Sequence, residues 1–225
     1  MKKFELKAEA RPEVGKKSLK ALRAEGKIPA VLNGGKVVEL PYTGTLKPGE
    51  RVVEIDLDKD VKGKKTSRGI LTTDISVKIE DVRKLIYTPD IFEIDLELNG
   101  ETRKAVMKDL QFQPVKDTVL HIDFLEVGPE KPIIMEVPVK IEGHAEGVKA
   151  GGKLQLSMRK LKVKAIYDKI PERLVINVDN LGLGKSIAVG DLHFEGLELM
   201  NAKNAVVCAV QLTRAARGAQ AKAEA

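Results

Sequence analysis

The segment from Phe92 to Gly100 constrains the fold of this chain most strongly. Every second residue from Phe92 to Leu98 is apolar, the residues between them are acidic, and Asn99-Gly100 follows directly. Strict alternation is typical of a strand with one buried face, and Asn-Gly is a preferred pair in a two-residue hairpin turn. The sequence therefore predicts a β-hairpin, with its return strand over Glu101–Lys108.

Similar short β patterns recur along the rest of the 225 residues. Two short helices are expected between them, one capped by Ser18 and stopped by Gly26, the other over Glu80–Ile86. Ile28–Leu32 contains a proline and is expected at a sheet edge, and residues 59–69 are expected to form an exposed loop. The remaining expected strands are Phe4–Ala10, Val52–Leu57, Val119–Val127, Ile133–Ile141, Leu154–Leu156, Leu161–Ile166, Leu174–Val178, Ile187–Val189 and Ala205–Leu212.

The segment from Gly128 to Pro132 (sequence GPEKP) has the composition of a linker. We therefore expect a mainly β protein with short helices and two domains, residues 1–129 and 130–213. Short strands separated by Gly and Asn turns favour a small β-sandwich-like or barrel-like second domain. Residues 214–225 are rich in Ala, lack an apolar face, and are expected to be a disordered tail.

Charge is concentrated at one end of the chain. Residues 1–36 hold ten Lys and Arg against four acidic residues, which accounts for the whole net charge of +6. A basic pole on a neutral body indicates an anionic partner, although a solvated surface is the simpler explanation. Only eight residues are Phe or Tyr and none is Trp, which argues against a site built on stacked bases.

Motifs for catalysis and metal binding are missing from the sequence. It contains no HExxH, CxxC or GxSxG pattern, and its three histidines are widely spaced. Gly184-Lys185-Ser186 matches the end of a phosphate-binding loop, but Asp179 stands where that motif needs its first glycine. Cys208 lies in an apolar run and is expected to be buried. We expect no catalytic residue, metal, cofactor, small-molecule substrate or membrane span, and a cytoplasmic location.

His121 and Asp123 are two positions apart on an expected strand, so both side chains leave the same face. Three interpretations are open: a hydrated surface pair, a general base with its orienting carboxylate, and hydrogen-bonding groups for RNA bases or 2′-hydroxyls. Lys16, Lys20 and Arg23 share one face of the first expected helix, where a row of cations can follow a phosphate backbone.

Two separated motifs resemble one family. The first comprises RPEVGK (Arg11–Lys16) and LRAEGKIPAVLNGG (Leu22–Gly35). The second comprises DLQFQPVKD (Asp109–Asp117) and HIDF (His121–Phe124). In this order they resemble the bacterial large-subunit ribosomal protein twenty-five family, which includes the general stress protein Ctc. Residues 130–213 resemble the extra domain of the long form of that family.

The resemblance implies a six-stranded-type β-barrel that binds 5S ribosomal RNA (rRNA) in the central protuberance of the large ribosomal subunit, next to other ribosomal proteins. The RNA-contacting positions that it implies are Arg11, Lys16, Lys20, Arg23, Gln111, His121 and Asp123. Asn33 stands where the family usually has tyrosine, so an aromatic contact with RNA is lost or is replaced by an amide hydrogen bond. The chain also has a longer segment around residues 44–69, whose basic loop (Lys62, Lys64, Lys65, Arg68) touches rRNA or is a solvated insertion.

Two other functions stay open at this stage. The same barrel could act off the ribosome as a stress-related RNA chaperone or a tRNA-binding module, and His121 with Asp123 could serve a nuclease. Residues 130–213 hold twelve basic and ten acidic residues, so we expect this domain to make few phosphate contacts.

Overall fold

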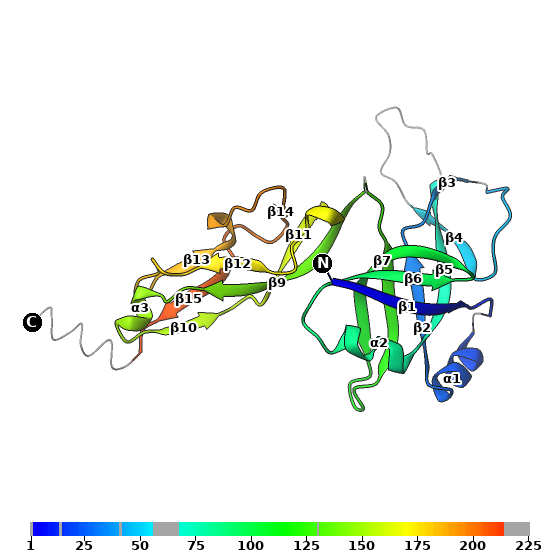
Figure 1. The fold of residues 1–225 in the computed structure, drawn as a ribbon, viewed down its shortest axis with the longest axis horizontal. Coiled ribbons are helices and arrows are strands. Elements are labelled where there is room, and N and C mark those ends of the chain that lie inside the picture. Colours follow the sequence, from blue (N-terminus) through cyan, green and yellow to red (C-terminus); the bar gives the residue numbers. More distant parts are fainter. Residues whose placement is uncertain (1, 14, 41, 56–67, 130, 214–225) are drawn as a thin grey trace, which may run out of the picture. The chain divides into compact units, whose positions relative to one another are not determined.

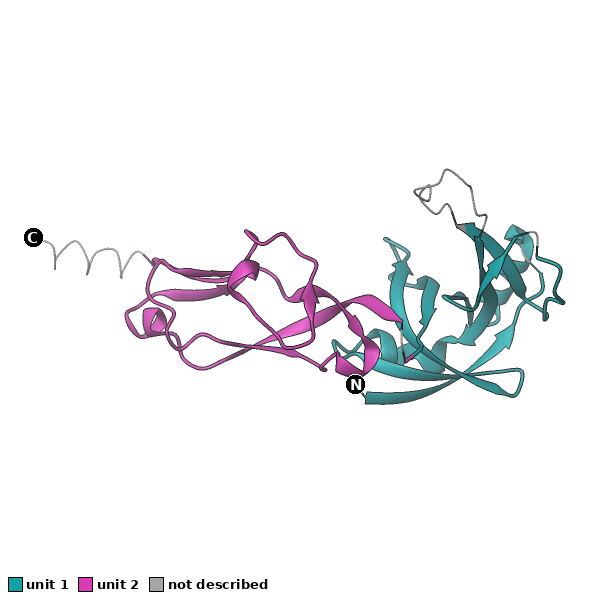
Figure 2. Cartoon of the chain, turned by 90° about the horizontal axis from the view of Figure 1, so that it is seen from above, with its two compact units in different colours: residues 1–128 teal, residues 129–225 magenta. Residues whose placement is uncertain are grey.

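The computed structural model describes residues 2–13, 15–40, 42–55, 68–129 and 131–213. The chain separates into two compact units, unit 1 (residues 1–128) and unit 2 (residues 129–225), coloured differently in Figure 2. The expected tail and most of the expected basic loop (residues 56–67) lie outside the described residues.

Unit 1 is a closed β-barrel (Figure 1). Its strands are β1 (Lys2–Ala10), β2 (Lys27–Asn33), β3 (Val37–Glu39), β4 (Glu50–Ile55), β5 (Arg68–Lys78), β6 (Phe92–Leu98), β7 (Glu101–Phe112) and β8 (Val119–Glu126). Six of them pair in the order β1-β6-β7-β8-β2-β5, and β5 pairs again with β1 to close the ring. The other two, β3 and β4, pair with the N-terminal part of β5. The predicted barrel is thus confirmed.

The hairpin between β6 and β7 is as the alternation predicts. Asn99 and Gly100 have φ angles of 52° and 83°, the left-handed conformation that both central residues of a type I′ turn require. The return strand β7 continues to Phe112, four residues beyond the predicted end.

The two helices of unit 1 are α1 (Lys16–Ala24) and α2 (Ile79–Ile86). Gly26 follows α1 with φ 75°, and its N–H donates to the Arg23 carbonyl, so the predicted stop is confirmed. The predicted cap is wrong: Gly15 is the N-cap, and Ser18 lies in the first turn, where its hydroxyl donates to the Gly15 carbonyl.

Two sequence-based expectations about the barrel strands are corrected. β2 is not an edge strand, because it pairs with β5 on one side and with β8 on the other. Pro29 has no backbone N–H to donate. It fits there because the pairing of β2 with β8 begins only at the next residue, Ala30. Arg68 and Gly69, expected in a loop, begin β5, a central strand that the sequence patterns did not predict.

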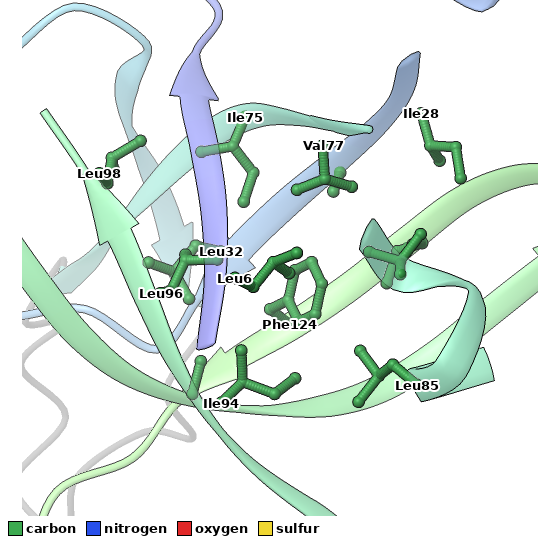
Figure 3. Packing of buried hydrophobic residues seen from close by; sticks show 14 of the residues in the cluster. Leu6, Ile28, Leu32, Ile75, Val77, Leu85, Ile94, Leu96, Leu98 and Phe124 are labelled. Carbon is green, nitrogen blue, oxygen red and sulfur yellow. The ribbon is translucent and has the colours of Figure 1, made fainter. Parts of the chain in front are cut away.

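The barrel interior is filled by aliphatic side chains around one fully buried aromatic ring (Figure 3), and Phe4 and Phe92 pack against this cluster while partly exposed. Phe124 on β8 is fully buried, opposite Leu32 on β2 and Met107 on β7. Helix α2 adds Val82 and Leu85 to the same core. The burial of this apolar surface is the main stabilising contribution to unit 1.

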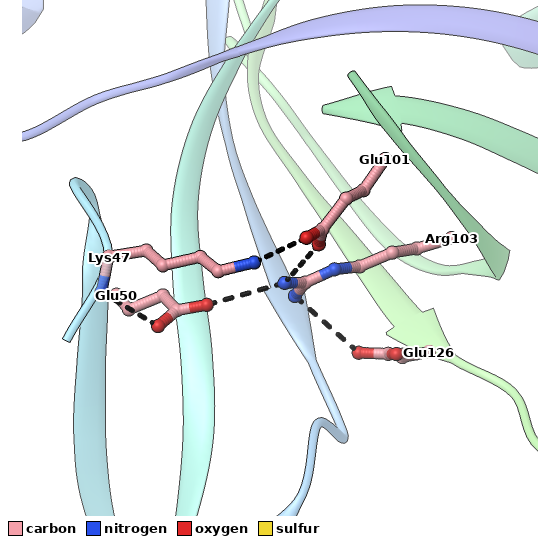
Figure 4. A network of polar contacts seen from close by, with 5 residues as sticks. All are labelled: Lys47, Glu50, Glu101, Arg103 and Glu126. Atoms are coloured by element: carbon pink, nitrogen blue, oxygen red, sulfur yellow. Dashed lines mark hydrogen bonds and ion pairs between the residues drawn. The ribbon is translucent and has the colours of Figure 1, made fainter. Parts of the chain in front are cut away.

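A network of charged side chains is centred on two residues of the inward-facing row of β7, Glu101 and Arg103 (Figure 4). Arg103 contacts three carboxylates, those of Glu50 at 3.3 Å, Glu101 at 3.5 Å and Glu126 at 4.0 Å. Lys47 also bonds to Glu101, and Lys47 and then Arg103 lower the pKa of that carboxyl. Arg103 therefore joins the start of β4, the hairpin and the end of β8.

Replacing Arg103 with alanine should lower the free energy of unfolding by about 2 kcal/mol, because it leaves the mostly buried Glu50 carboxylate without its cation. Arg83→Ala on the exposed face of α2 removes the same charge and should change stability by less than about 0.5 kcal/mol. Urea unfolding of unit 1 checks both values. Equal stabilities of the two variants would contradict the structural role of Arg103.

Unit 2 contains a four-stranded and a three-stranded sheet. Its elements are β9 (Pro132–Glu142), α3 (Glu146–Lys149), β10 (Lys153–Leu156), β11 (Lys160–Ile166), a helical turn (Tyr167–Lys169), β12 (Leu174–Asn177), β13 (Ser186–Ala188), a second turn (Val189–Asp191), β14 (Glu198–Leu199) and β15 (Val206–Gln211). The sheet orders are β12-β9-β11-β14 and β10-β15-β13. Every strand predicted in this region is present, and only β14 was not predicted.

Candidate nucleic-acid interface

A β-bulge in β7 turns Gln111 to the outside of the barrel. Met107 pairs with Phe124, but Asp109 pairs with Asp123, so one extra residue, Lys108, is inserted in β7. The inside-outside alternation changes at this point, and Leu110 continues the core while Asp109 and Gln111 face outward. Gln111 then lies opposite His121 on β8. Simple alternation along β7 would have placed Gln111 inside the barrel.

His121 and Asp123 form a close pair on the outer face of β8. The Nδ1 atom of His121 lies 2.8 Å from Oδ1 of Asp123, and both side chains are partly exposed. A proton on Nδ1 then donates to the carboxylate, so Nε2 is the ring atom left to meet a ligand. The pair thus offers an oriented imidazole nitrogen and further carboxylate lone pairs, which suit directional hydrogen bonds.

Asn33 lies on the same outer face. β2 runs parallel to β8, with Val31 opposite Asp123 and Asn33 opposite Leu125. Residues paired across neighbouring strands share a face, so the structure brings Asn33, Gln111, His121 and Asp123 together on β2, β8 and β7. We call these four residues the polar strip.

Helix α1 places a basic row beside the polar strip. Lys16, Lys20 and Arg23 are spaced to share one helix face, and all three are exposed. The helix packs against β2, and the Arg23 guanidinium donates to the carbonyl of Leu120 at 2.9 Å. This bond fixes the C-terminal end of the basic row one residue away from His121.

Arg11 differs from the other predicted cations because its side chain is only 10% exposed. Its Nη2 lies 3.9 Å from Oδ1 of Asp74, a buried residue of β5 that also meets Arg51 of β4 at 3.5 Å. The sequence interpretation missed both Asp74 and Arg51. A lone acidic residue inside the otherwise uncharged run ILTTDISV (Ile70–Val77) was the available signal, since a buried carboxylate needs a cation or several donors.

Other candidate chemistry finds no support in the geometry. Gly184 and Lys185 form a turn bonded to Val210, and Ser186 begins β13, so no helix follows as a phosphate-binding loop requires. Cys208 is buried, which raises the pKa of its thiol. Among the described residues there is no cluster of three or more His, Cys, Asp or Glu side chains suited to a metal ion. The described helices also include none with the length and apolar character needed to cross a membrane.

Two family models match the chain. The model described as the ribosomal L25p family matches residues 6–75 and 61–124, which together span the barrel. The model described as ribosomal protein TL5, C-terminal domain, matches residues 132–214. The boundary between the two units lies in the short gap between the two matches.

Relatives that match along the full length of the chain indicate the same family. The chain is 56% identical to the large ribosomal subunit protein bL25 of Parabacteroides distasonis, over 99% of this chain and 100% of the relative. It is 54% identical to the protein of that name from Porphyromonas gingivalis, over 99% of both chains, and 48% identical to that from Bacteroides thetaiotaomicron, again over 99% of both. The chain therefore belongs to the ribosomal L25p family, in a form that carries a TL5 C-terminal domain.

Proposed function

We propose that this protein is a structural constituent of the bacterial large ribosomal subunit, where unit 1 binds 5S rRNA in the central protuberance. The supporting observation is the assembly of Asn33, Gln111, His121 and Asp123 on one barrel face beside the basic row of α1. Relatives along the whole chain are named large ribosomal subunit proteins. The protein acts as a ribosomal component in the cytoplasm and breaks no bond in the RNA.

The two groups of side chains have different tasks in this function. Lys16, Lys20 and Arg23 neutralise phosphates and set the orientation of the barrel on the RNA, which carries no sequence information. The polar strip bonds to base edges and 2′-hydroxyls, which the wide, shallow minor groove of an RNA helix exposes. Asn33 supplies an amide donor and acceptor where most of the family supplies a ring.

Binding of the full-length protein to 5S rRNA should weaken steeply as salt rises, because bound cations release counterions from the RNA. For the three phosphate contacts of the basic row, the slope of log affinity against log salt should be about −2.5, so affinity falls roughly 30-fold between about 50 and 200 mM salt. A filter-binding titration measures this slope. A slope near zero would show that the basic row is not the docking surface.

Sucrose-gradient sedimentation separates the ribosomal role from the alternatives. The protein should travel with large subunits at a salt concentration that supports 5S binding. A chaperone or tRNA-binding module acting off the ribosome would stay at the top of the gradient. Incubation with end-labelled 5S rRNA tests the nuclease, and intact RNA is the expected result.

A further inference from the structure

Strand β1 leaves part of one backbone edge open. It pairs with β6 from Lys2 to Ala8, but with β5 only from Ala8 to Ala10. β5 ends at Lys78, and the chain continues directly into α2. The described strands therefore provide no partner for the N-terminal half of β1 on this side, and a helix cannot continue a ladder of strand hydrogen bonds.

The pairing pattern shows which backbone groups are affected. The N–H of Arg11 donates to the Asp74 carbonyl at 2.9 Å, just beyond the β1–β5 pair. In an antiparallel pair the backbone groups of every second residue face the partner strand, so those of Lys3, Glu5 and Lys7 face the same side as those of Arg11. Among the described residues, the N–H and C=O groups of Lys3 and Glu5 find no backbone partner. A short row of donors and acceptors thus remains available at this edge.

A groove follows the open edge. Its volume is about 660 Å³, and four consecutive residues of β1, Phe4–Lys7, line it together with Glu80, Asp81 and Lys84 of α2. Side chains alternate between the two faces of a strand, so a space that reaches four residues in a row runs along the backbone. Residues 3–7 span about 13 Å, which matches an extended segment of about five residues. The edge is therefore accessible to a further strand.

The groove is acidic, although the whole chain has a net charge of +6. Five carboxylates and only two lysines, Lys7 and Lys84, line it. Glu97 lies 3.8 Å from Lys7. Within the described part of the chain, the other four carboxylates make no ion pair: Glu5, Glu80, Asp81 and Asp95. Such a surface repels RNA and attracts cationic side chains.

The groove lies on the side of the barrel away from the polar strip. The ring of strands runs β1-β6-β7-β8-β2-β5 and returns to β1, so the junction of β1 with β5 is opposite the β7–β8 pair. That pair carries Gln111 and His121. RNA bound to the polar strip therefore leaves the groove open to another partner.

We propose that the open edge of β1 binds an extended segment of another protein, rich in lysine or arginine, which adds a strand to the barrel. In this mode of recognition, main-chain hydrogen bonds give affinity and alternate side chains give specificity. The segment pairs with the free backbone groups of Lys3 and Glu5, and its cations meet the carboxylates of α2 and β6. An open strand edge pairs readily with other chains, and the acidic rim restricts this one to cationic segments. The proposal does not depend on binding to 5S rRNA.

The test uses the full-length protein and a fluorescent synthetic peptide of about ten residues that alternates lysine with threonine. Fluorescence anisotropy should show binding, and a dissociation constant above about 1 mM would overturn the proposal. A peptide with glutamate in place of lysine should not bind. The lysine peptide with methylated backbone nitrogens keeps its charges but cannot donate to β1, so it should bind at least about 10-fold more weakly. Equal binding of the methylated peptide would mean that no strand is added.

Variants of the protein locate the bound peptide. Asp81→Asn combined with Glu97→Gln removes two carboxylates of the groove and should weaken binding about 5-fold. Glu54→Gln, an exposed carboxylate of β4 outside the groove, should change nothing. If the groove variant binds as tightly as the wild type, the peptide lies elsewhere and the proposal is wrong.

A proline tests the backbone edge itself. Glu5→Pro removes an N–H that faces the open edge rather than β6, so it should weaken binding about 5-fold, against about 2-fold for Glu5→Gln. Equal effects of the two substitutions would contradict strand addition. Thermal unfolding shows whether Glu5→Pro is folded, and if it is not, the methylated peptide decides.

Sedimentation velocity distinguishes the other occupant of such an edge, a second copy of this chain. The free protein should sediment as a monomer. A dimer that the lysine peptide dissociates would overturn the proposal, because β1 would then pair with itself. Failure of the wild-type protein to bind 5S rRNA would overturn the proposed function and leave this inference standing.

Discussion

Phe124→Ala should lower the free energy of unfolding of unit 1 by about 4 kcal/mol, the largest effect expected of any single substitution in the barrel. Phe124 is fully buried between Leu32 and Met107, on strands that pair with β8 from either side. Truncation removes the transfer free energy of a phenyl ring and leaves a cavity that a closed barrel cannot easily collapse. A domain of this size has a total stability of about 5–15 kcal/mol, so much of it is lost.

Circular dichroism during heating measures this loss. For a unit of this size the melting temperature should fall by about 15 °C. Phe112→Ala is the matched control, since Phe112 is also a barrel-strand phenylalanine but is 43% exposed. It should shift the melting temperature by less than about 3 °C. Similar shifts in the two variants would mean that the ring of Phe124 does not hold the core together.

The strands that the sequence predicted best are those with simple alternation. β6 and β8 each put apolar side chains on one face, and the Asn99-Gly100 turn specifies how β6 continues into β7. The sequence patterns did not predict β5 because its buried residues include polar ones, which break the apolar pattern: Thr72, Thr73, Asp74 and Ser76. Their burial depends on partners from β2 and β4 and from the Arg11 segment, and these contacts are long-range.

The candidate site was predictable residue by residue but not as a surface. The motifs identified Gln111, His121 and Asp123 as candidate residues. However, Gln111 lies opposite His121 only because of the bulge at Lys108, and no local sequence pattern in β7 predicts that bulge. The role of Arg11 could not be judged from the sequence either, because its burial follows from contact with Asp74, 63 positions away. Register and burial are properties of the closed sheet, and they decide which charged residues face outward.

The second large effect is expected on RNA binding, when the His121–Asp123 pair is replaced. Replacing both residues with alanine should weaken binding to 5S rRNA about 30-fold, because two directional hydrogen-bonding groups are lost from the polar strip. Binding to an unrelated RNA duplex should fall less than about 3-fold, since the phosphate contacts of α1 remain. Selectivity for 5S rRNA should therefore drop about 10-fold.

Lys20→Ala is the comparison that separates the two kinds of contact. Lys20 is an exposed member of the basic row, so its loss should weaken binding to both RNAs by a similar few-fold factor and reduce the salt slope by about one. The double variant should keep the wild-type slope, because its charges toward phosphate are unchanged. Parallel titrations of the three proteins with the two RNAs measure all of these quantities. If the double variant loses affinity for both RNAs equally, His121 and Asp123 do not recognise the 5S structure, and the polar strip serves only as part of a general RNA-binding surface.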